Sequence, residues 1–240
     1  MADELLPGPD ADAGVSDAAV SDAAVSDAAV SGAAVSGAAV AARAAKAALR
    51  ARLLAARTRQ DAAERAYAAR ALGAALGALP ELAEARTVAA YVPVGSEPGP
   101  ADLAAVLAGS GRRVLLPVLL ADNDLDWAVY DGPASLLAAA RGLREPGGRR
   151  LGPDAVADAD LVVVPGLAVD RHGMRLGRGG GSYDRALARL APGAFTAVLL
   201  YDGELLEAVP AEPHDRPVRA ALLPERTVRF GPEYVRPASD

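Results

Sequence analysis

The sequence contains no cysteine and only two histidines, His172 and His214, among its 240 residues. The lack of cysteine excludes disulfides, thiolate zinc sites, iron–sulfur clusters and a cysteine nucleophile. A metal site built from several imidazoles is excluded as well, so any metal would be a hard cation held by carboxylates and phosphates. Aromatic residues make up only 4% of the chain, which leaves few rings to stack on nucleic-acid bases.

The first 42 residues lack lysine and arginine. They hold seven of the 31 acidic residues, so the formal net charge of −6 arises there. The rest of the chain has 24 acids against 25 bases. A nearly neutral body has no basic excess for nucleic acid, and we expect no such partner. With 52% hydrophobic residues, the body is apolar enough to bury a core.

From Val15 to Val40 the chain repeats a five-residue unit, first VSDAA and then VSGAA. A step of five advances about 140° around a helix and changes faces on a strand, so neither structure collects the valines on one side. We expect residues 1–42 to form a low-complexity tail, disordered or weakly helical, and residues 43–240 to form a single domain. Neither a signal peptide nor a membrane span is recognisable, which favours a cytoplasmic protein with no membrane partner.

In the body, apolar runs typical of strands alternate with helical stretches. Helices are expected at 41–59, 61–79, 101–109 and 183–191, and strands at 86–92, 113–119, 126–130, 161–165 and 196–201. This alternation predicts an α/β fold with a mostly parallel sheet. Because ligands bind beyond the carboxyl ends of the strands in such sheets, the segments that follow the strands are the place to look for a site.

The segment PGLAVDRHGMRLGRGGGSYDRAL, residues 165–187, follows a fully apolar strand and opens a helix. Its glycines let backbone N–H groups converge on an anion, and the helix N-terminus and the arginines add positive charge. We therefore predict a polyphosphate-binding loop. It is neither a Walker A loop nor a GxGxxG dinucleotide fingerprint, because no Gly-Lys-Ser/Thr follows and residue 182 is Ser. The alternative is a flexible loop with no ligand.

Asp184 lies in the first turn of the helix that this loop opens. Its carboxylate either stabilises the positive helix end or binds the Mg²⁺ that bridges nucleotide phosphates. Asp215, in the proline-bounded loop PAEPHDRP, is its candidate partner, although an isolated loop aspartate is usually a turn former. The residues alone leave both alternatives open.

The loop sequence resembles the PGLAFDxxGxRLGxGxGYYDxxL motif of the 5-formyltetrahydrofolate cyclo-ligase (5,10-methenyltetrahydrofolate synthetase) family. Weaker, collinear matches are KAALRARLL, YVPVGSEPGP, RVLLPVL, LREPGG and VPAEPHDRPV. The resemblance covers residues 43–229 and implies a three-layer α/β/α sandwich. It implies a ligase that uses ATP and Mg²⁺ to cyclise 5-formyltetrahydrofolate to 5,10-methenyltetrahydrofolate through a phosphorylated formyl group, with release of ADP and phosphate.

The resemblance also implies roles for individual residues. Lys46 and Arg50 match a nucleotide-binding pair and, at i and i+4, share one helix face; without the resemblance they would be taken as a solvated basic face. The loop residues matched to ATP binding are Arg175, Leu176, Gly177, Arg178, Gly179, Gly180, Gly181, Ser182 and Tyr183. The residues matched to the folate are Val92, Glu97, Arg178, Gly179, Gly180, Gly181 and Ser182. Arg178 and Tyr183 are the predicted catalytic residues, and Asp184 and Asp215 the predicted Mg²⁺ ligands.

Three positions depart from the family's pattern. Gly180 stands where the family usually has a basic residue, Ser182 where it has tyrosine, and Arg219 where it has an acid. These departures keep two other interpretations open: a non-catalytic folate- or nucleotide-binding relative, and a sugar-phosphate isomerase-like enzyme that needs no ATP. ATP and 5-formyltetrahydrofolate are the expected small-molecule partners, and we expect a monomer or a weak homo-oligomer.

Overall fold

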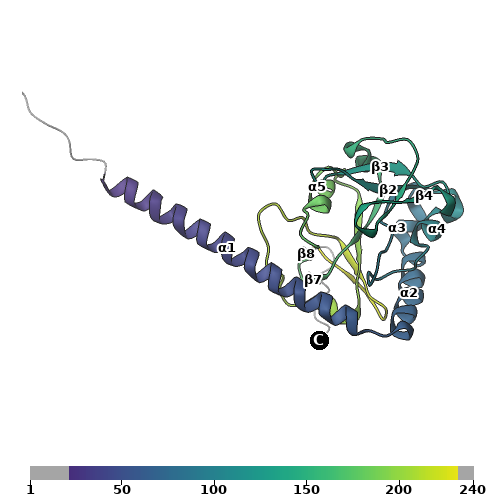
Figure 1. Cartoon of the computed structure of the whole chain (residues 1–240), viewed down its shortest axis with the longest axis horizontal. Helices are drawn as coiled ribbons and strands as arrows, with labels where there is room; N and C mark the ends of the chain where they lie inside the picture. Colours follow the sequence, from purple (N-terminus) through teal and green to yellow (C-terminus); the bar gives the residue numbers. More distant parts are fainter. Residues whose placement is uncertain (1–21, 232–240) are drawn as a thin grey trace, which may run out of the picture. The chain divides into compact units, whose positions relative to one another are not determined.

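The computed structural model describes residues 22–231. The chain divides into two compact units, Met1–Ala41 and Ala42–Asp240, and each is taken by itself. Helix α1, Asp22–Arg59, runs through both (Figure 1). Among the described residues, no helix is long and apolar enough to cross a membrane.

Residues 22–42, for which the sequence favours a disordered or weakly helical chain, are helical in the structure. Alanine has the highest helix propensity of all residues, and the interruptions in this stretch are single glycines rather than prolines. The helix therefore continues although the repeat builds no apolar face. The prediction for residues 1–21 lies outside the described residues, and the single domain at 43–240 stays a prediction.

The second unit alternates strands with short helices. Its helices after α1 are α2 (Ala62–Gly77), α3 (Pro80–Glu84), α4 (Leu103–Ala108) and α5 (Ser182–Ala188), with 3-10 segments η1 (Gly109–Gly111), η2 (Pro133–Ser135), η3 (Ala140–Gly142), η4 (Pro153–Asp158) and η5 (Asp202–Glu204). Its strands are β1 (Thr87–Ala89), β2 (Arg113–Leu119), β3 (Leu125–Val129), β4 (Leu136–Ala138), β5 (Arg144–Pro146), β6 (Leu161–Pro165), β7 (Ala168–Asp170), β8 (Arg175–Leu176), β9 (Phe195–Leu199), β10 (Leu205–Leu206), β11 (Ala220–Leu222) and β12 (Thr227–Arg229).

Seven of these strands form one sheet, in the order β12-β11-β9-β6-β1-β2-β3. Neighbours from β11 to β2 are parallel, while β12 and β3 join the two edges antiparallel. The predicted α/β class with a mostly parallel sheet is confirmed. A three-stranded sheet, β10-β7-β8, and the β4–β5 hairpin complete the strands.

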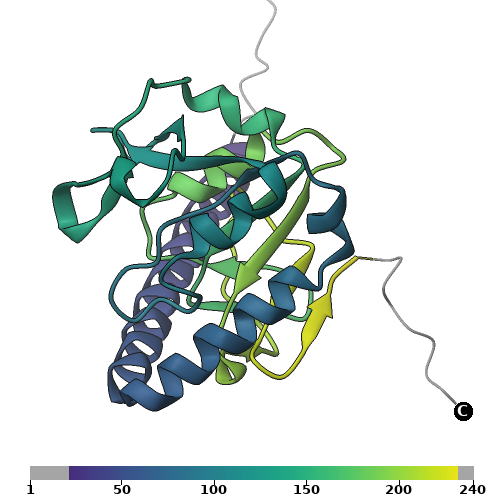
Figure 2. The ribbon, with the colours of Figure 1, turned by 90° about the vertical axis from the view of Figure 1, so that its right-hand side faces the viewer.

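The central sheet is covered on both faces. Successive strand residues point to opposite faces, so Val163 packs with Leu72 and Leu76 of α2, whereas Val162 packs with Val156 of η4 and Ala186 of α5. Helices α3 and α4 add to the first cluster, and Figure 2 shows α2 and α4 crossing in front of the strands. The layers are therefore helices, sheet and helices.

Several boundaries differ from the expected ones. The expected helix 61–79 ends at Gly77, and Pro80 begins α3 instead of only ending α2, because proline is tolerated in a helix's first turn. Of the expected strand 86–92, only Thr87–Ala89 forms a strand, β1. In place of the expected helix 183–191, the shorter α5 spans Ser182–Ala188. Within the predicted glycine-rich loop, Ala168–Asp170 and Arg175–Leu176 pair as a hairpin because their apolar side chains are buried.

The turn between β7 and β8 requires glycine at position 173. Gly173 has a φ of +81°, and a Cβ there would lie 2.4 Å from the carbonyl oxygen of Val218. That carbon would therefore meet backbone, which cannot move aside as a flexible side chain does. By contrast, a Cβ on Gly193 has nothing within 4 Å.

We predict that Gly173→Ala lowers the free energy of unfolding by more than about 1 kcal/mol, because alanine cannot adopt this backbone conformation without strain. The measurement is urea unfolding followed by circular dichroism. Gly193→Ala is the matched control and should stay within about 1 kcal/mol of the wild type. Equal stability of the two variants would contradict this account of the turn.

Candidate functional site

A cavity of about 970 Å³ opens where β1, β2 and β6 end. Its wall includes every site residue predicted from the sequence: Lys46, Arg50, Val92, Glu97, the run from Arg175 to Asp184, and Asp215. These residues come from four distant parts of the chain, and the sheet brings them together at the carboxyl ends of its parallel strands, as expected for this fold class. Their individual roles stay predictions.

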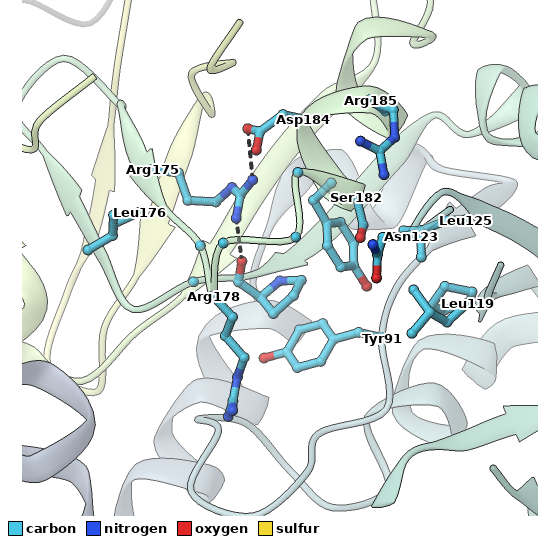
Figure 3. Close-up of a pocket in the computed structure, with 18 of the residues that line it drawn as sticks. Tyr91, Leu119, Asn123, Leu125, Arg175, Leu176, Arg178, Ser182, Asp184 and Arg185 are labelled. Atoms are coloured by element: carbon cyan, nitrogen blue, oxygen red, sulfur yellow. Dashed lines mark hydrogen bonds and ion pairs between the residues drawn. The ribbon is translucent and has the colours of Figure 1, made fainter. Parts of the chain in front are cut away.

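The glycine-rich loop, residues 177–181, leads from β8 to α5 along this cavity (Figure 3). Within the described chain, the backbone N–H groups of residues 178–181 donate to no protein acceptor. Gly179 has a φ of +107°, and a Cβ there would lie 3.3 Å from Cζ of Arg50. Glycine thus permits both the backbone conformation and the close approach of the guanidinium. The result is a run of N–H donors without protein acceptors in residues that line the cavity, which suits an anion.

Helix α1 supplies the cations beside this loop. Lys46, Arg50, Leu53 and Arg57 follow one another at spacings of four, three and four, so they share one helix face. Leu53 packs against Leu167 and Leu176. Nε of Arg50 donates to the carbonyl oxygen of Gly177 at 2.9 Å. The helix is therefore docked on the strands that carry the loop.

Lys46 lies between two carboxylates. Its Nζ is 2.6 Å from Oδ2 of Asp215 and 2.8 Å from Oε2 of Glu212, and its side chain is only 6% exposed. Burial alone would lower the pKa of Lys46, but the hydrogen bonds and charges of Asp215 and Glu212 raise it above its usual value. Sequence reasoning missed Glu212; an acid three residues before Asp215 in the same proline-bounded loop is the signal that could have found it.

Arg175 lies beneath the loop rather than projecting into the cavity. Its side chain is 2% exposed, and it donates through Nη1 to the carbonyl oxygen of Pro165 at 3.1 Å and through Nη2 to Oδ1 of Asp184 at 3.0 Å (Figure 3). A Cβ on Gly177 would lie 2.7 Å from the same Nη1. The guanidinium therefore supports Gly177 from below and orients Asp184. Its predicted role in ATP binding stays a prediction.

The two predicted metal ligands keep oxygens available. In the hydrogen bonds of the described residues, Asp184 uses Oδ1 and Asp215 uses Oδ2. The described chain has no group of three or more metal-ligating side chains. A cation at this pair would complete its shell with water and ligand oxygens, which is how Mg²⁺ usually binds. The donor set therefore fits Mg²⁺.

Glu97 and Arg178, which also line the cavity, form a second contact with the glycine-rich loop. Nε of Arg178 donates to Oε1 of Glu97 at 3.1 Å, and the other carboxylate oxygen accepts from N–H of Val94 at 3.1 Å. Tyr183 lines the cavity nearby, and burial, followed by the charge of Glu97, raises the pKa of its phenol. The phenol therefore stays protonated and is a hydrogen-bond donor at neutral pH.

A buried ion pair between Arg57 and Glu204 lies where the chain leaves β6. Arg57 donates to Glu204 through Nε at 2.6 Å and through Nη2 at 2.8 Å, and its Nη2 also donates to the carbonyl oxygen of Gly166 at 2.6 Å. Glu204 in turn accepts from N–H of Tyr201. The pair therefore links α1 to the chain that leaves β6 and to the segment after β9.

Known proteins resemble this chain in both sequence and structure. Residues 42–224 match the model of the 5-formyltetrahydrofolate cyclo-ligase family. A 5-formyltetrahydrofolate cyclo-ligase of Mycolicibacterium smegmatis is 49% identical over 150 residues, 60% of this chain and 76% of that protein. The enzyme of the same name from Escherichia coli K12 is 30% identical over 150 residues, 61% of this chain and 82% of that protein.

Two solved structures share the fold. The 5,10-methenyltetrahydrofolate synthetase of Aquifex aeolicus superposes with a TM-score of 0.66 and 28% identity, covering 81% of this chain and 95% of that one. A Mycoplasma pneumoniae 5,10-methenyltetrahydrofolate synthetase gives a TM-score of 0.59 at 20% identity, covering 73% of this chain and 96% of that one; at this identity the likeness shows the fold alone.

We predict that Arg57→Met lowers the free energy of unfolding by about 3–5 kcal/mol, because it leaves the Glu204 carboxylate buried without its partner. The double variant Arg57→Met/Glu204→Leu should recover at least half of that loss, since it removes both charges. Urea unfolding of the single and double variants measures this. A double variant as unstable as the sum of the two single variants would contradict a coupled pair.

Proposed function

The chain belongs to the 5-formyltetrahydrofolate cyclo-ligase family, and from this membership we propose that it converts 5-formyltetrahydrofolate to 5,10-methenyltetrahydrofolate with ATP and Mg²⁺. The relatives that carry this name, and the match over residues 42–224, support ring closure as the reaction. The participation of ATP and Mg²⁺, the intermediate and the residue roles below are parts of the proposal.

The chemistry explains the need for ATP. The formyl oxygen of the substrate is a poor leaving group, so the reaction transfers the γ-phosphoryl group of ATP to it and releases ADP. N10 of the folate then attacks the formyl carbon, the carbon–oxygen bond breaks, and phosphate leaves with the oxygen while N10 loses its proton. Phosphoryl transfer depends on positioning and charge neutralisation rather than on a dedicated nucleophile, and the cavity holds none among its predicted residues.

The observation that carries the proposal is the run of unpaired N–H groups at 178–181, facing the cavity beside α1. In the proposed complex these groups bind phosphate oxygens, and Lys46 and Arg50 supply the neighbouring charge. Arg50 already has its Nε fixed on Gly177, so its two terminal nitrogens are positioned in advance. Lys46 would exchange part of its contact with Asp215 for the nucleotide.

Asp184 and Asp215 would hold Mg²⁺ through the carboxylate oxygens that accept no hydrogen bond from the described chain, and Oδ1 of Asp215, 3.7 Å from Nε2 of His214, would give up that neighbour. When bound, the ion would neutralise charge on the phosphates. Arg175 contributes by fixing the direction of Asp184 through the 3.0 Å hydrogen bond.

The folate would lie on the side of the loop that faces Glu97 and Val92. A carboxylate accepts two hydrogen bonds from the N–C–NH₂ edge of a pterin, and Glu97 would exchange its contacts with Arg178 and Val94 for that edge. Arg178 lies between this side and the loop, where its guanidinium can stabilise charge that develops on the transferred group. The protonated phenol of Tyr183 is a second donor there.

A direct assay tests the proposal: purified protein, 5-formyltetrahydrofolate and Mg·ATP, with the product followed by the absorbance that distinguishes methenyltetrahydrofolate from the substrate. We expect turnover with Mg·ATP and none without nucleotide or with excess chelator. Binding of both ligands without product would identify a non-catalytic relative. ATP-independent turnover of a sugar phosphate would identify the isomerase-like alternative.

In the same assay, Asp184→Asn should lower kcat by about 10²-fold or more, because a neutral amide neither binds Mg²⁺ well nor pairs with Arg175. Asp202→Asn, at an exposed position outside the cavity, is the matched control and should match the wild type. Thermal unfolding of both variants separates a loss of the site from a loss of the fold.

We predict that Gly180→Lys lowers the KM for ATP. Gly180 has no positive φ, and a Cβ there meets only Oγ of Ser182 at 3.2 Å, so a side chain is accommodated. An exposed charge beside the phosphates is worth about 0.5–1 kcal/mol, which is about a two- to fivefold decrease in KM.

Gly180→Gln, which has a side chain of similar reach without the charge, is the control and should leave the KM for ATP nearly unchanged. A lysine variant that behaves like the glutamine variant would show that position 180 does not face the nucleotide.

A further inference from the structure

Two turns that hold none of the predicted site residues build the wall of the cavity opposite Arg178. One is the β2–β3 turn, which brings Leu119, Asn123 and Leu125 to the cavity (Figure 3). The other is the tip of the β4–β5 hairpin, which brings Arg141 and Arg144. Arg144 lies in the LREPGG match, but no role was predicted for it or for Arg141.

The two turns contact each other at two residues that have a left-handed backbone conformation. Asn123 (φ 63°) and Arg141 (φ 60°) are the only residues other than glycine with positive φ in the described part of the chain. Such a conformation is uncommon at a non-glycine residue. The two side chains are hydrogen-bonded to each other, Nη1 of Arg141 to Oδ1 of Asn123 at 3.2 Å. Strained residues cluster at ligand sites, and here both line the same cavity.

A second contact fixes the hairpin beside the cavity. Oε1 of Glu145 accepts from N–H of Leu119 at 3.0 Å, which ties β5 to the end of β2. Inside the tip, N–H of Ala139 donates to the carbonyl oxygen of Leu143 at 2.9 Å. The hairpin is thus held at the cavity wall by its own backbone and by two contacts with the β2–β3 turn.

Positive charge at this wall is not neutralised by protein. Among the described residues, neither Arg141 nor Arg144 forms an ion pair. Nη1 of Arg141 has only the amide oxygen of Asn123, and Nη2 of Arg144 has a backbone carbonyl at 3.5 Å. The nearest acid in sequence, Glu145, accepts from backbone. Two guanidinium groups therefore face solvent at the edge of the cavity with most of their donors free.

Apolar side chains lie beside these charges. Pro117, Leu119, Leu125 and Leu143 line the same part of the wall. An apolar strip with two unpaired guanidiniums beside it matches a ligand that ends in an aromatic ring followed by carboxylates. Guanidinium is the group that binds carboxylates with two parallel hydrogen bonds.

We propose that Arg141 and Arg144 form a subsite for the carboxylates of the substrate's glutamyl tail. This inference rests on the proposed function, which makes the ligand a folate with a p-aminobenzoyl ring and a terminal glutamate. With the pterin at Glu97, the ring lies along the apolar strip and the tail carboxylates reach the hairpin tip. The two arginines select for substrates that carry the tail and take no part in the bond changes.

The test uses two substrates that differ only in the tail: 5-formyltetrahydrofolate and the matching pteroyl amide, which ends in a neutral carboxamide and lacks both glutamyl carboxylates. Initial rates are measured on the full chain for the wild type, Arg141→Gln, Arg144→Gln and the double variant, at low and high salt. Arg149→Gln is the control, because Arg149 is exposed and does not line the cavity.

Each single variant should raise the KM for 5-formyltetrahydrofolate about tenfold, the usual effect of losing one charge-assisted hydrogen-bonding partner, and should change kcat far less. The KM for the amide should stay that of the wild type. High salt should raise the wild-type KM for the acid only.

Equal changes of KM for both substrates, a loss confined to kcat, or no change for either would overturn the subsite while leaving the proposed reaction intact. A wild type that turns over neither substrate would overturn the proposed function, and the inference with it. Thermal unfolding confirms that each variant is folded.

Discussion

The site depends on one face of α1. Lys46 and Arg50 lie one turn apart on this face and Arg57 two turns further on. Each binds a different segment: residues 212–215, the glycine-rich loop and the chain after β6. Each contact joins a cation to a carbonyl or carboxylate oxygen, and hydrogen bonds of this charge-assisted kind are stronger than neutral ones. Without α1 the loop would lose its lateral support, and its N–H groups would no longer converge.

Several charged residues of the cavity are held in ion pairs. Lys46 is paired with Glu212 and Asp215, Arg178 with Glu97, and Arg175 with Asp184. In the proposed reaction, ligands replace part of these pairings: phosphate takes the cations, while the metal ion and the pterin take the carboxylates. Arg175 differs from the rest because it is buried beneath the loop and has a structural partner in Pro165. The side chain of Arg178, by contrast, is half-exposed.

Strand patterns and glycine spacing are local signals and were sufficient for the fold class and the glycine-rich loop, while the family resemblance supplied the other predicted residues that line the cavity. The sequence could not reveal pairings between distant segments. Glu212 with Lys46 and Glu204 with Arg57 are separated by 166 and 147 residues, and no local pattern marks them. The left-handed backbone at Asn123 and Arg141 was also hidden, because it is imposed by the hairpins on either side rather than by a glycine. For the described part of the repeat, the sequence left a disordered and a weakly helical chain open, and the structure has a helix because helix propensity outweighs the lack of an apolar face.

The most direct test of the account is a crystal structure with Mg²⁺ and a non-hydrolysable ATP analogue. We expect the triphosphate against the N–H groups of residues 178–181, with Lys46 and Arg50 on one side and the metal ion between Asp184 and Asp215. A nucleotide bound elsewhere, with the loop and its ion pairs unchanged, would contradict the central claim that this loop holds the phosphates.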